Sequence, residues 1–251
     1  MQRLFTFGCS FTHFYYPTWA DILGKEFEYH ENWARKRSGN QFIAHTVAEA
    51  VLRSKITKDD VVIVMWSNYN RDDRYYKDSW ISTGNLFHYD VYPKEFVDQF
   101  ISMRGCVMRD ALLFYLTDNL LKQIGCEYYF TSIDNLAAPL TSAADAGDKF
   151  DDVIELYKDT YAKFMPSAKE VLFGNEWPNR ADFHPTPNEH LKYVQTIFPA
   201  FKISEETINL VQQIETELDL TKNNEQLLAT QSWKRHIWNI WGNRNFPKQR
   251  F

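Results

Sequence analysis

The stretch VVIVMW, residues 61 to 66, is the strongest strand signal in the chain and decides the fold class. It is a continuous run of β-branched and other apolar residues, without the alternation of a strand that has one face in water. Such a run is typical of a central parallel strand that is covered on both faces. We therefore predict a parallel sheet with helices on both of its sides.

The segments around this strand alternate between strand and helix patterns. We expect further strands at residues 3–8, 27–29 and 127–132, and helices at residues 18–25, 41–54, 100–124, 150–164, 188–198 and 204–218. Strands that alternate with helices indicate an α/β fold built as a three-layer α/β/α sandwich.

The chain of 251 residues has room for one sizeable α/β domain and an appendage. We assign residues 1–220 to the domain, with a polar, aromatic insertion at about 69–99, and residues 221–251 to a basic, Trp-rich tail. The insertion is either a lid or wall over a cleft or a solvated excursion. The tail has tryptophans that suit one face of a helix, which would dock on the domain, on another subunit or in an assembly: Trp233, Trp238 and Trp241.

Charge and composition exclude several classes of protein. The net charge is −5, whereas a general nucleic-acid binder is usually basic. No stretch approaches the roughly 18 apolar residues of a membrane helix, and the first residues lack the apolar run of a signal peptide. The three cysteines are widely spaced, which suits reduced thiols rather than a zinc site. We expect a cytoplasmic protein with no metal and no membrane span.

The stretch FTFGCSFTH, residues 5–13, ends a strand in small residues that can carry chemistry. Ligands bind beyond the carboxyl ends of parallel strands, which is a suitable place for a nucleophilic Ser10. A serine needs a nearby base, and Asp182 and His184 provide a carboxylate and an imidazole. Read alone, each segment also fits an ordinary turn or helix entry. Cys9 is a second candidate nucleophile, although we expect its side chain to turn into the sheet.

Two further turns carry groups that suit an oxyanion. Ser38-Gly39-Asn40 precedes a helix, and Trp66-Ser67-Asn68 follows the central strand. A glycine N–H and an asparagine amide are both suitable donors to a developing negative charge.

The order of these segments resembles the SGNH, or GDSL-type, hydrolase family over about residues 1–200. The segments that carry the resemblance are Gly8-Cys9-Ser10, NWARKRSGNQFIA at 32–44, VVIVMWSN at 61–68 and DFHPTP at 182–187. Cys9 stands where the family usually has Asp, Trp66-Ser67-Asn68-Tyr69 replaces Gly-x-Asn-Asp, and one residue instead of two separates Asp182 from His184. The sequence of the third and last of these segments is also similar to that of phage-encoded and environmental members of the family.

The resemblance implies a flavodoxin-like sandwich and the hydrolysis of esters, often acetyl or acyl groups on glycans or lipids, without a cofactor. Ser10 would be the nucleophile, His184 the base and Asp182 its partner. The N–H of Gly39 and the amide of Asn68 would hold the oxyanion, with Asn40 as the alternative amide. The substrate would be a small-molecule or glycan ester that contacts Trp66, Tyr69 and Arg71.

Two other functions fit the same sequence. The chain could be a non-catalytic member of the fold with a binding or structural role, for example in a virus particle if it is phage-encoded. It could also be an O-acyltransferase that uses the same triad and passes the acyl group to a sugar.

Overall fold

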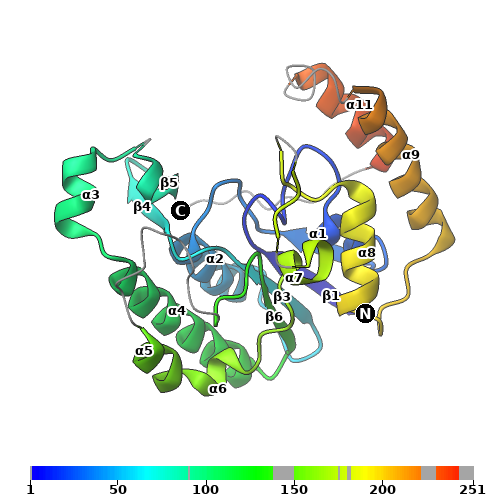
Figure 1. Ribbon diagram of the computed structural model, residues 1–251. Helices are drawn as coiled ribbons and strands as arrows, with labels where there is room; N and C mark the ends of the chain where they lie inside the picture. Colours follow the sequence, from blue (N-terminus) through cyan, green and yellow to red (C-terminus); the bar gives the residue numbers. More distant parts are fainter. Residues whose placement is uncertain are drawn as a thin grey trace.

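A four-stranded parallel sheet lies at the centre of the computed structural model (Figure 1). In sheet order its strands are β2 (Tyr29–Asn32), β1 (Arg3–Phe7), β3 (Val61–Trp66) and β6 (Glu127–Ser132). Every residue of β3 is buried, which confirms its predicted central place in a parallel sheet of an α/β fold. The structure describes residues 2–89, 91–137, 150–174, 176–179, 182–221 and 230–242.

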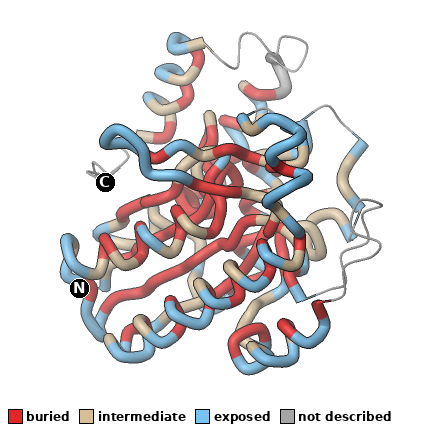
Figure 2. Tube along the Cα trace, turned by 90° about the vertical axis from the view of Figure 1, so that its left-hand side faces the viewer, coloured by how far each residue is buried: buried red, intermediate tan, exposed pale blue. Residues whose placement is uncertain are grey.

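Helices cover both faces of the sheet, and successive residues of β3 point alternately to the two faces. One face packs Val61, Ile63 and Met65 with the helices α1 (Trp19–Gly24), α8 (Pro187–Ile197) and α9 (Glu205–Thr221). The other packs Val62, Val64 and Trp66 with α2 (Asn40–Arg53) and α4 (Met103–Ile124). Figure 2 shows buried strands inside and helices with exposed outer sides.

The order of the strands places a topological switch point between β1 and β3. From β1 the chain passes through α1 to β2 on one side, and from β3 it passes by way of α4 to β6 on the other side. At such a switch point the connections leave neighbouring strands in opposite directions, and ligands bind beyond the carboxyl ends of these strands. Ser10 follows β1 and Asn68 follows β3, so both residues lie at this edge.

The predicted insertion forms a small unit with its own secondary structure. It contains an antiparallel hairpin of β4 (Arg71–Tyr76) and β5 (Ser79–Asn85), a short 3-10 helix (Leu86–His88) and α3 (Lys94–Phe100). Lys77 and Asp78 form the turn of the hairpin, both with positive φ angles of 49° and 61°. Two consecutive left-handed residues match the twist of the flanking strands, as in type I′ turns.

The segment after β6 differs from its predicted single helix. Residues 150–164 contain two short helices, α5 (Asp151–Leu156) and α6 (Lys158–Tyr161), and α7 (Ala168–Phe173) follows. The start of α7 has a capping box, in which Ser167 and Glu170 each bond the other's backbone N–H. That Ser-x-x-Glu signal is present in the sequence, so α7 was predictable.

The C-terminal helix α11 (Gln231–Trp241) packs against α9 (Figure 1). Its buried residues Trp233, Ile237 and Trp241 belong to the same apolar cluster as α1 and α8. Lys25, just after α1, holds its ammonium 5.3 Å from the ring of Trp241. Part of the Trp-rich tail is thus integrated in the core. Within the described residues, no helix has the length and apolar character needed to span a membrane.

Candidate active site

The turn after β1 presents Ser10 at the carboxyl edge of the sheet. The N–H groups of Thr12 and His13 both donate to the carbonyl of Cys9 at 3.0 Å, which bends the chain tightly around Ser10. Gly8 makes this bend possible, because a Cβ at this position would lie 2.1 Å from the Thr12 hydroxyl oxygen. The side chain of Cys9 is fully buried, as predicted, whereas Ser10 keeps 8% of its surface exposed.

Ser10, His184 and Asp182 form one continuous chain of hydrogen bonds. The Nε2 of His184 lies 2.9 Å from the Oγ of Ser10, and its Nδ1 lies 2.5 Å from the Oδ1 of Asp182. The same Asp182 oxygen accepts the backbone N–H of His184 at 2.9 Å, which bends the loop and directs both side chains together. This arrangement favours the tautomer with a proton on Nδ1, leaving Nε2 free to accept a proton from Ser10.

The loop that carries His184 is anchored at the start of α8. Thr186 caps this helix in a capping box with Glu189, and Pro187 occupies the first turn. The hydroxyl of Tyr16 donates to the carbonyl of Pro185 at 3.1 Å, which ties the loop to the segment after Ser10. This contact helps to hold His184 within hydrogen-bond distance of Ser10, although the two residues are 174 positions apart in the chain.

Aromatic rings surround the imidazole of His184. Phe14 lies against it with ring centroids 4.2 Å apart and planes at 21°, and Phe183 is nearly parallel to it at 5.7 Å. Phe11 approaches at 5.2 Å with a tilt of 46°. These contacts restrict rotation of the imidazole and limit the access of water to it.

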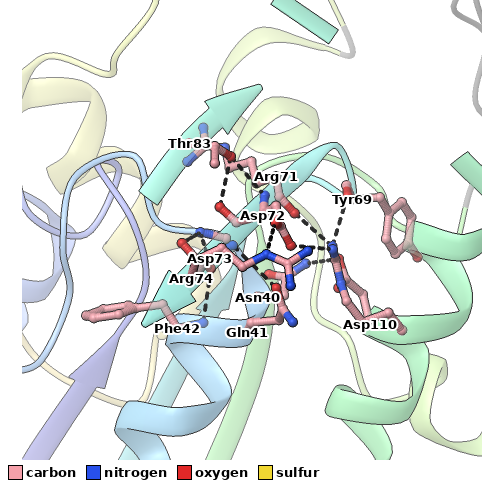
Figure 3. A network of polar contacts seen from close by, with 12 residues as sticks. Asn40, Gln41, Phe42, Tyr69, Arg71, Asp72, Asp73, Arg74, Thr83 and Asp110 are labelled. Atoms are coloured by element: carbon pink, nitrogen blue, oxygen red, sulfur yellow. Dashed lines mark hydrogen bonds and ion pairs between the residues drawn. The ribbon is translucent and has the colours of Figure 1, made fainter. Parts of the chain in front are cut away.

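The N–H of Gly39, the predicted oxyanion donor, makes a contact with the hairpin in the structure. The N–H of Gly39 donates to both carboxylate oxygens of Asp73, at 3.1 and 3.0 Å, and the N–H of Phe42 donates to the same side chain at 3.0 Å. Asp73 therefore caps the N-terminus of α2 (Figure 3). Since the N–H of Gly39 is already used, it is not available to a substrate.

Asn40, the predicted alternative donor, also makes internal contacts. Its amide nitrogen donates to the Ser67 carbonyl at 3.0 Å and to a carboxylate oxygen of Asp110 at 2.7 Å. Its amide oxygen accepts the N–H of Ser67 at 2.8 Å. Asn40 is fully buried and links α2, the end of β3 and α4.

A buried acidic network extends from this point, and the sequence analysis missed it. Arg109 donates to Asp110 at 2.7 Å, to Asp72 at 3.3 Å and to the carbonyl of Arg71 at 2.8 Å. Burial raises the pKa of Asp110 to about 6, against the opposing effects of Arg109 and Asn40. Burial likewise raises the pKa of Asp73. The network fastens the hairpin to α2 and α4.

Asn68 and the backbone of Ser10 retain groups that could serve an oxyanion. Asn68 is half-buried at the end of β3, and no hydrogen bond between described residues engages its amide nitrogen, the group that can donate; its buried Oδ1 is an acceptor without a partner among the same residues. Within that same part of the chain, no hydrogen bond uses the N–H of Ser10. These two residues are thus the donors that remain for the predicted role.

The three residues predicted to contact the substrate also make internal contacts. Trp66 is fully buried and packs on Phe114 at 4.6 Å, because the last residue of β3 points into the layer of α4. Tyr69 is 2% exposed, and its hydroxyl bonds the Leu136 carbonyl at 2.5 Å. Arg71 is half-buried and donates to the Ser38 carbonyl at 3.0 Å. Trp66 and Tyr69 belong to the core, and Arg71 holds the loop before α2.

Among the described residues, no three His, Cys, Asp or Glu side chains gather into a group that could hold a metal ion.

Comparison with known proteins does not assign the chain to a family. No model of a known protein family matches the chain, and a search among curated proteins finds no match either.

Proposed function

We propose that this protein is a serine ester hydrolase of the SGNH type that works through an acyl-enzyme intermediate. The observation that carries the proposal is the hydrogen-bonded chain from Ser10 through His184 to Asp182. A serine is a weak nucleophile until a base accepts its proton, and these contacts provide that base and a carboxylate that orients it. The parallel sheet with Ser10 after its first strand also suits the resemblance in the sequence.

The reaction would proceed in two steps. His184 takes the proton of Ser10 while the serine oxygen attacks the ester carbonyl, and the N–H of Ser10 and the amide of Asn68 stabilise the oxyanion. The imidazolium then protonates the leaving alcohol. A water molecule, deprotonated by His184, attacks the acyl-enzyme and releases the acid. The expected substrates are small acyl esters, acetyl esters above all, on a carbohydrate or another polar alcohol.

A fluorophosphonate probe tests the proposal directly, because it reacts with serines that a base activates. We expect mass spectrometry to find the label on Ser10 in the wild type and no label in His184→Ala. Hydrolysis of p-nitrophenyl acetate should fall to background in Ser10→Ala and His184→Ala. An unlabelled, inactive wild type with a native circular dichroism spectrum would refute the proposal.

One observation favours a second function, that of a non-catalytic binding protein. The predicted donor Gly39 and the alternative donor Asn40 are occupied by Asp73, Ser67 and Asp110. A site with fewer donors stabilises an oxyanion less, at a cost on the order of 10²–10³ in rate for each donor lost. Labelling of Ser10 distinguishes the two functions, since a purely binding role requires no activated serine.

A further inference from the structure

Two lysine ammonium groups contact the ring of one tyrosine close to Ser10. The ammonium of Lys36 lies 2.9 Å from the centroid of the Tyr15 ring, and that of Lys234 lies 4.4 Å from it. Lys36 is in the loop after β2, whereas Lys234 belongs to α11, and all three side chains are half-buried. A tyrosine ring attracts a cation, so Tyr15 gathers positive charges from two distant segments. We name Lys36 and Lys234 the lysine pair.

The like charges of the lysine pair lie close to one another. Because both ammonium groups contact the same ring, the distance between them cannot exceed the sum of the two contact distances. Two charges at such a distance repel each other, and partial burial weakens the screening by water and salt. The Tyr15 ring offsets part of this repulsion. An anion bound to both ammonium groups would offset the rest, which favours a negatively charged ligand at this position.

A chain of ring contacts joins the lysine pair to the triad. The ammonium of Lys36 lies 4.9 Å from the ring of Phe14, and that ring lies 4.2 Å from the His184 imidazole. The imidazole in turn is hydrogen-bonded to Ser10. The charge of Lys36 is therefore one aromatic ring away from the base. A substrate whose carbonyl carbon lies at Ser10 can reach this charge with a group a few bonds from the carbonyl.

The fold holds both lysines in place. Arg35, the residue before Lys36, donates its backbone N–H to the carbonyl of Gly8 at 3.2 Å, which ties the loop to the turn after β1. Trp233, the residue before Lys234, is buried in the core cluster that includes α1 and α8. The C-terminal helix thus brings a cation to the candidate active site.

We propose that the lysine pair binds a negatively charged group, a carboxylate or a phosphate, of the ester whose carbonyl lies at Ser10. This inference rests on the proposed function and adds a charge to its substrate. Hydrogen bonds from ammonium groups to such oxygens are among the stronger polar contacts. The chain as a whole carries a net charge of −5 and repels anions, so an anionic substrate requires a local excess of positive charge. The lysine pair supplies this excess beside the triad.

The test compares esters that differ in one charge. On the alcohol side, 4-acetoxybenzoate is paired with neutral 4-acetoxybenzamide, and on the acyl side, mono-p-nitrophenyl adipate is paired with neutral p-nitrophenyl hexanoate. For the pair of esters whose charge reaches the lysines, the ratio of kcat/KM for the anionic ester to kcat/KM for the neutral one should fall about fivefold in Lys36→Gln and in Lys234→Gln. Lys36→Arg and Lys234→Arg keep the charge and should keep the ratio.

Lys158→Gln is the matched control. It removes the same charge from α6, where the side chain is 64% exposed and the helix packs on the opposite face of the sheet, and it should leave the ratio unchanged. In the wild type, added salt should lower the ratio, because salt screens the attraction between the lysine pair and the anionic ester.

If both glutamine variants keep the wild-type ratio for both pairs of esters, the inference is overturned and the hydrolase remains. If the wild type cleaves none of the four esters, the proposed function fails, and calorimetric titration with the same esters tests the lysine pair separately. Tighter binding of an anionic ester than of its neutral counterpart, weakened in Lys36→Gln, supports the lysine pair. Equal affinities, or no binding of either anionic ester, refute it.

Discussion

The phenyl ring of Phe14 covers one face of the His184 imidazole, with centroids 4.2 Å apart. Phe14 is itself 8% exposed and follows Ser10 by four residues. One segment therefore supplies both the serine and the aromatic ring that packs on the His184 imidazole. Phe14→Leu keeps an apolar side chain but loses the flat contact. We expect kcat for p-nitrophenyl acetate to fall about tenfold with little change in KM, because small misplacement of a base is costly.

Phe14→Tyr provides the matched control, since it retains the ring and should retain most of the kcat. Equal kcat values for the leucine variant and the wild type would show that the ring does not position His184. Thermal unfolding of both variants separates this effect from a general loss of structure.

Asn68 is the side chain that we expect to hold the oxyanion. Asn68→Ala should lower kcat by a factor on the order of 10²–10³ and leave KM nearly unchanged, because the donor acts mainly in the transition state. Steady-state kinetics with p-nitrophenyl acetate measure this loss. A loss of less than threefold would assign the oxyanion to backbone groups alone.

Gly8 is required by a close approach and not by a positive φ angle. In Gly8→Ala, the new methyl group would overlap the Thr12 side chain, whose oxygen lies 2.1 Å from the ideal Cβ position. We expect a loss of about 1–3 kcal/mol in the free energy of unfolding, together with lower activity, because the turn moves Ser10. Urea denaturation measures the first effect and ester hydrolysis the second.

Adding Thr12→Ala to Gly8→Ala removes the closest of these contacts and should recover part of the stability. The Thr12 hydroxyl has no hydrogen-bond partner in the described part of the chain, so its own removal should cost little. Strictly additive effects of the two substitutions would argue against the predicted clash.

The buried carboxyl group of Asp110 makes stability depend on pH. Burial raises its pKa to about 6 in the folded protein, from an ordinary value of 3.8. Between these values the folded state binds more protons than the unfolded state, so this group lowers stability as the pH rises from about 4 to 6. Asp110→Asn cannot titrate. Its free energy of unfolding relative to the wild type should therefore rise across this window and level off above it.

Urea denaturation of both proteins at several pH values between 4 and 7.5 gives this difference. Subtraction removes the contributions of carboxylates that the two proteins share, such as Asp60, whose pKa is lowered in the folded state despite burial, through its bonds with Arg3 and Thr57. A difference that stays constant with pH would refute the raised pKa of Asp110.

The central strands were predictable because their signals are local. β3 and β6 occupy the predicted residues, since continuous apolar or aromatic runs report burial directly. β2 was expected at residues 27–29 but occupies Tyr29–Asn32. The polar sequence of these residues lacks the apolar run that indicates a buried strand. Its buried Glu31 is satisfied by Trp33 and by Ser54, the latter 23 residues away. A local pattern cannot reveal a carboxylate that distant groups accommodate.

The difference between local sequence signals and contacts from distant residues also applies to the candidate site. Ser10, Asp182 and His184 were chosen for their chemistry, and the structure brings them into contact. Gly39 and Asn40 were chosen in the same way, but partners 34 and 70 residues away occupy them. Those partners come from the hairpin and from α4, and no spacing in the sequence links them to the turn before α2. Whether another residue already engages a hydrogen-bond donor depends on the fold and cannot be predicted from the local sequence.

The packing of α11 also orders events during synthesis. The face of the sheet against α2 and α4 is completed by segments that end near residue 164, so it can form on a nascent chain. The opposite face joins β1 and α1 to α8, α9 and α11, so it is complete only after residues 231–241 have left the ribosome. His184 follows Ser10 by 174 residues, so the hydrogen bond between them can form only after residue 184 has emerged. If Ser10 is the nucleophile that we propose, it stays without its base until then.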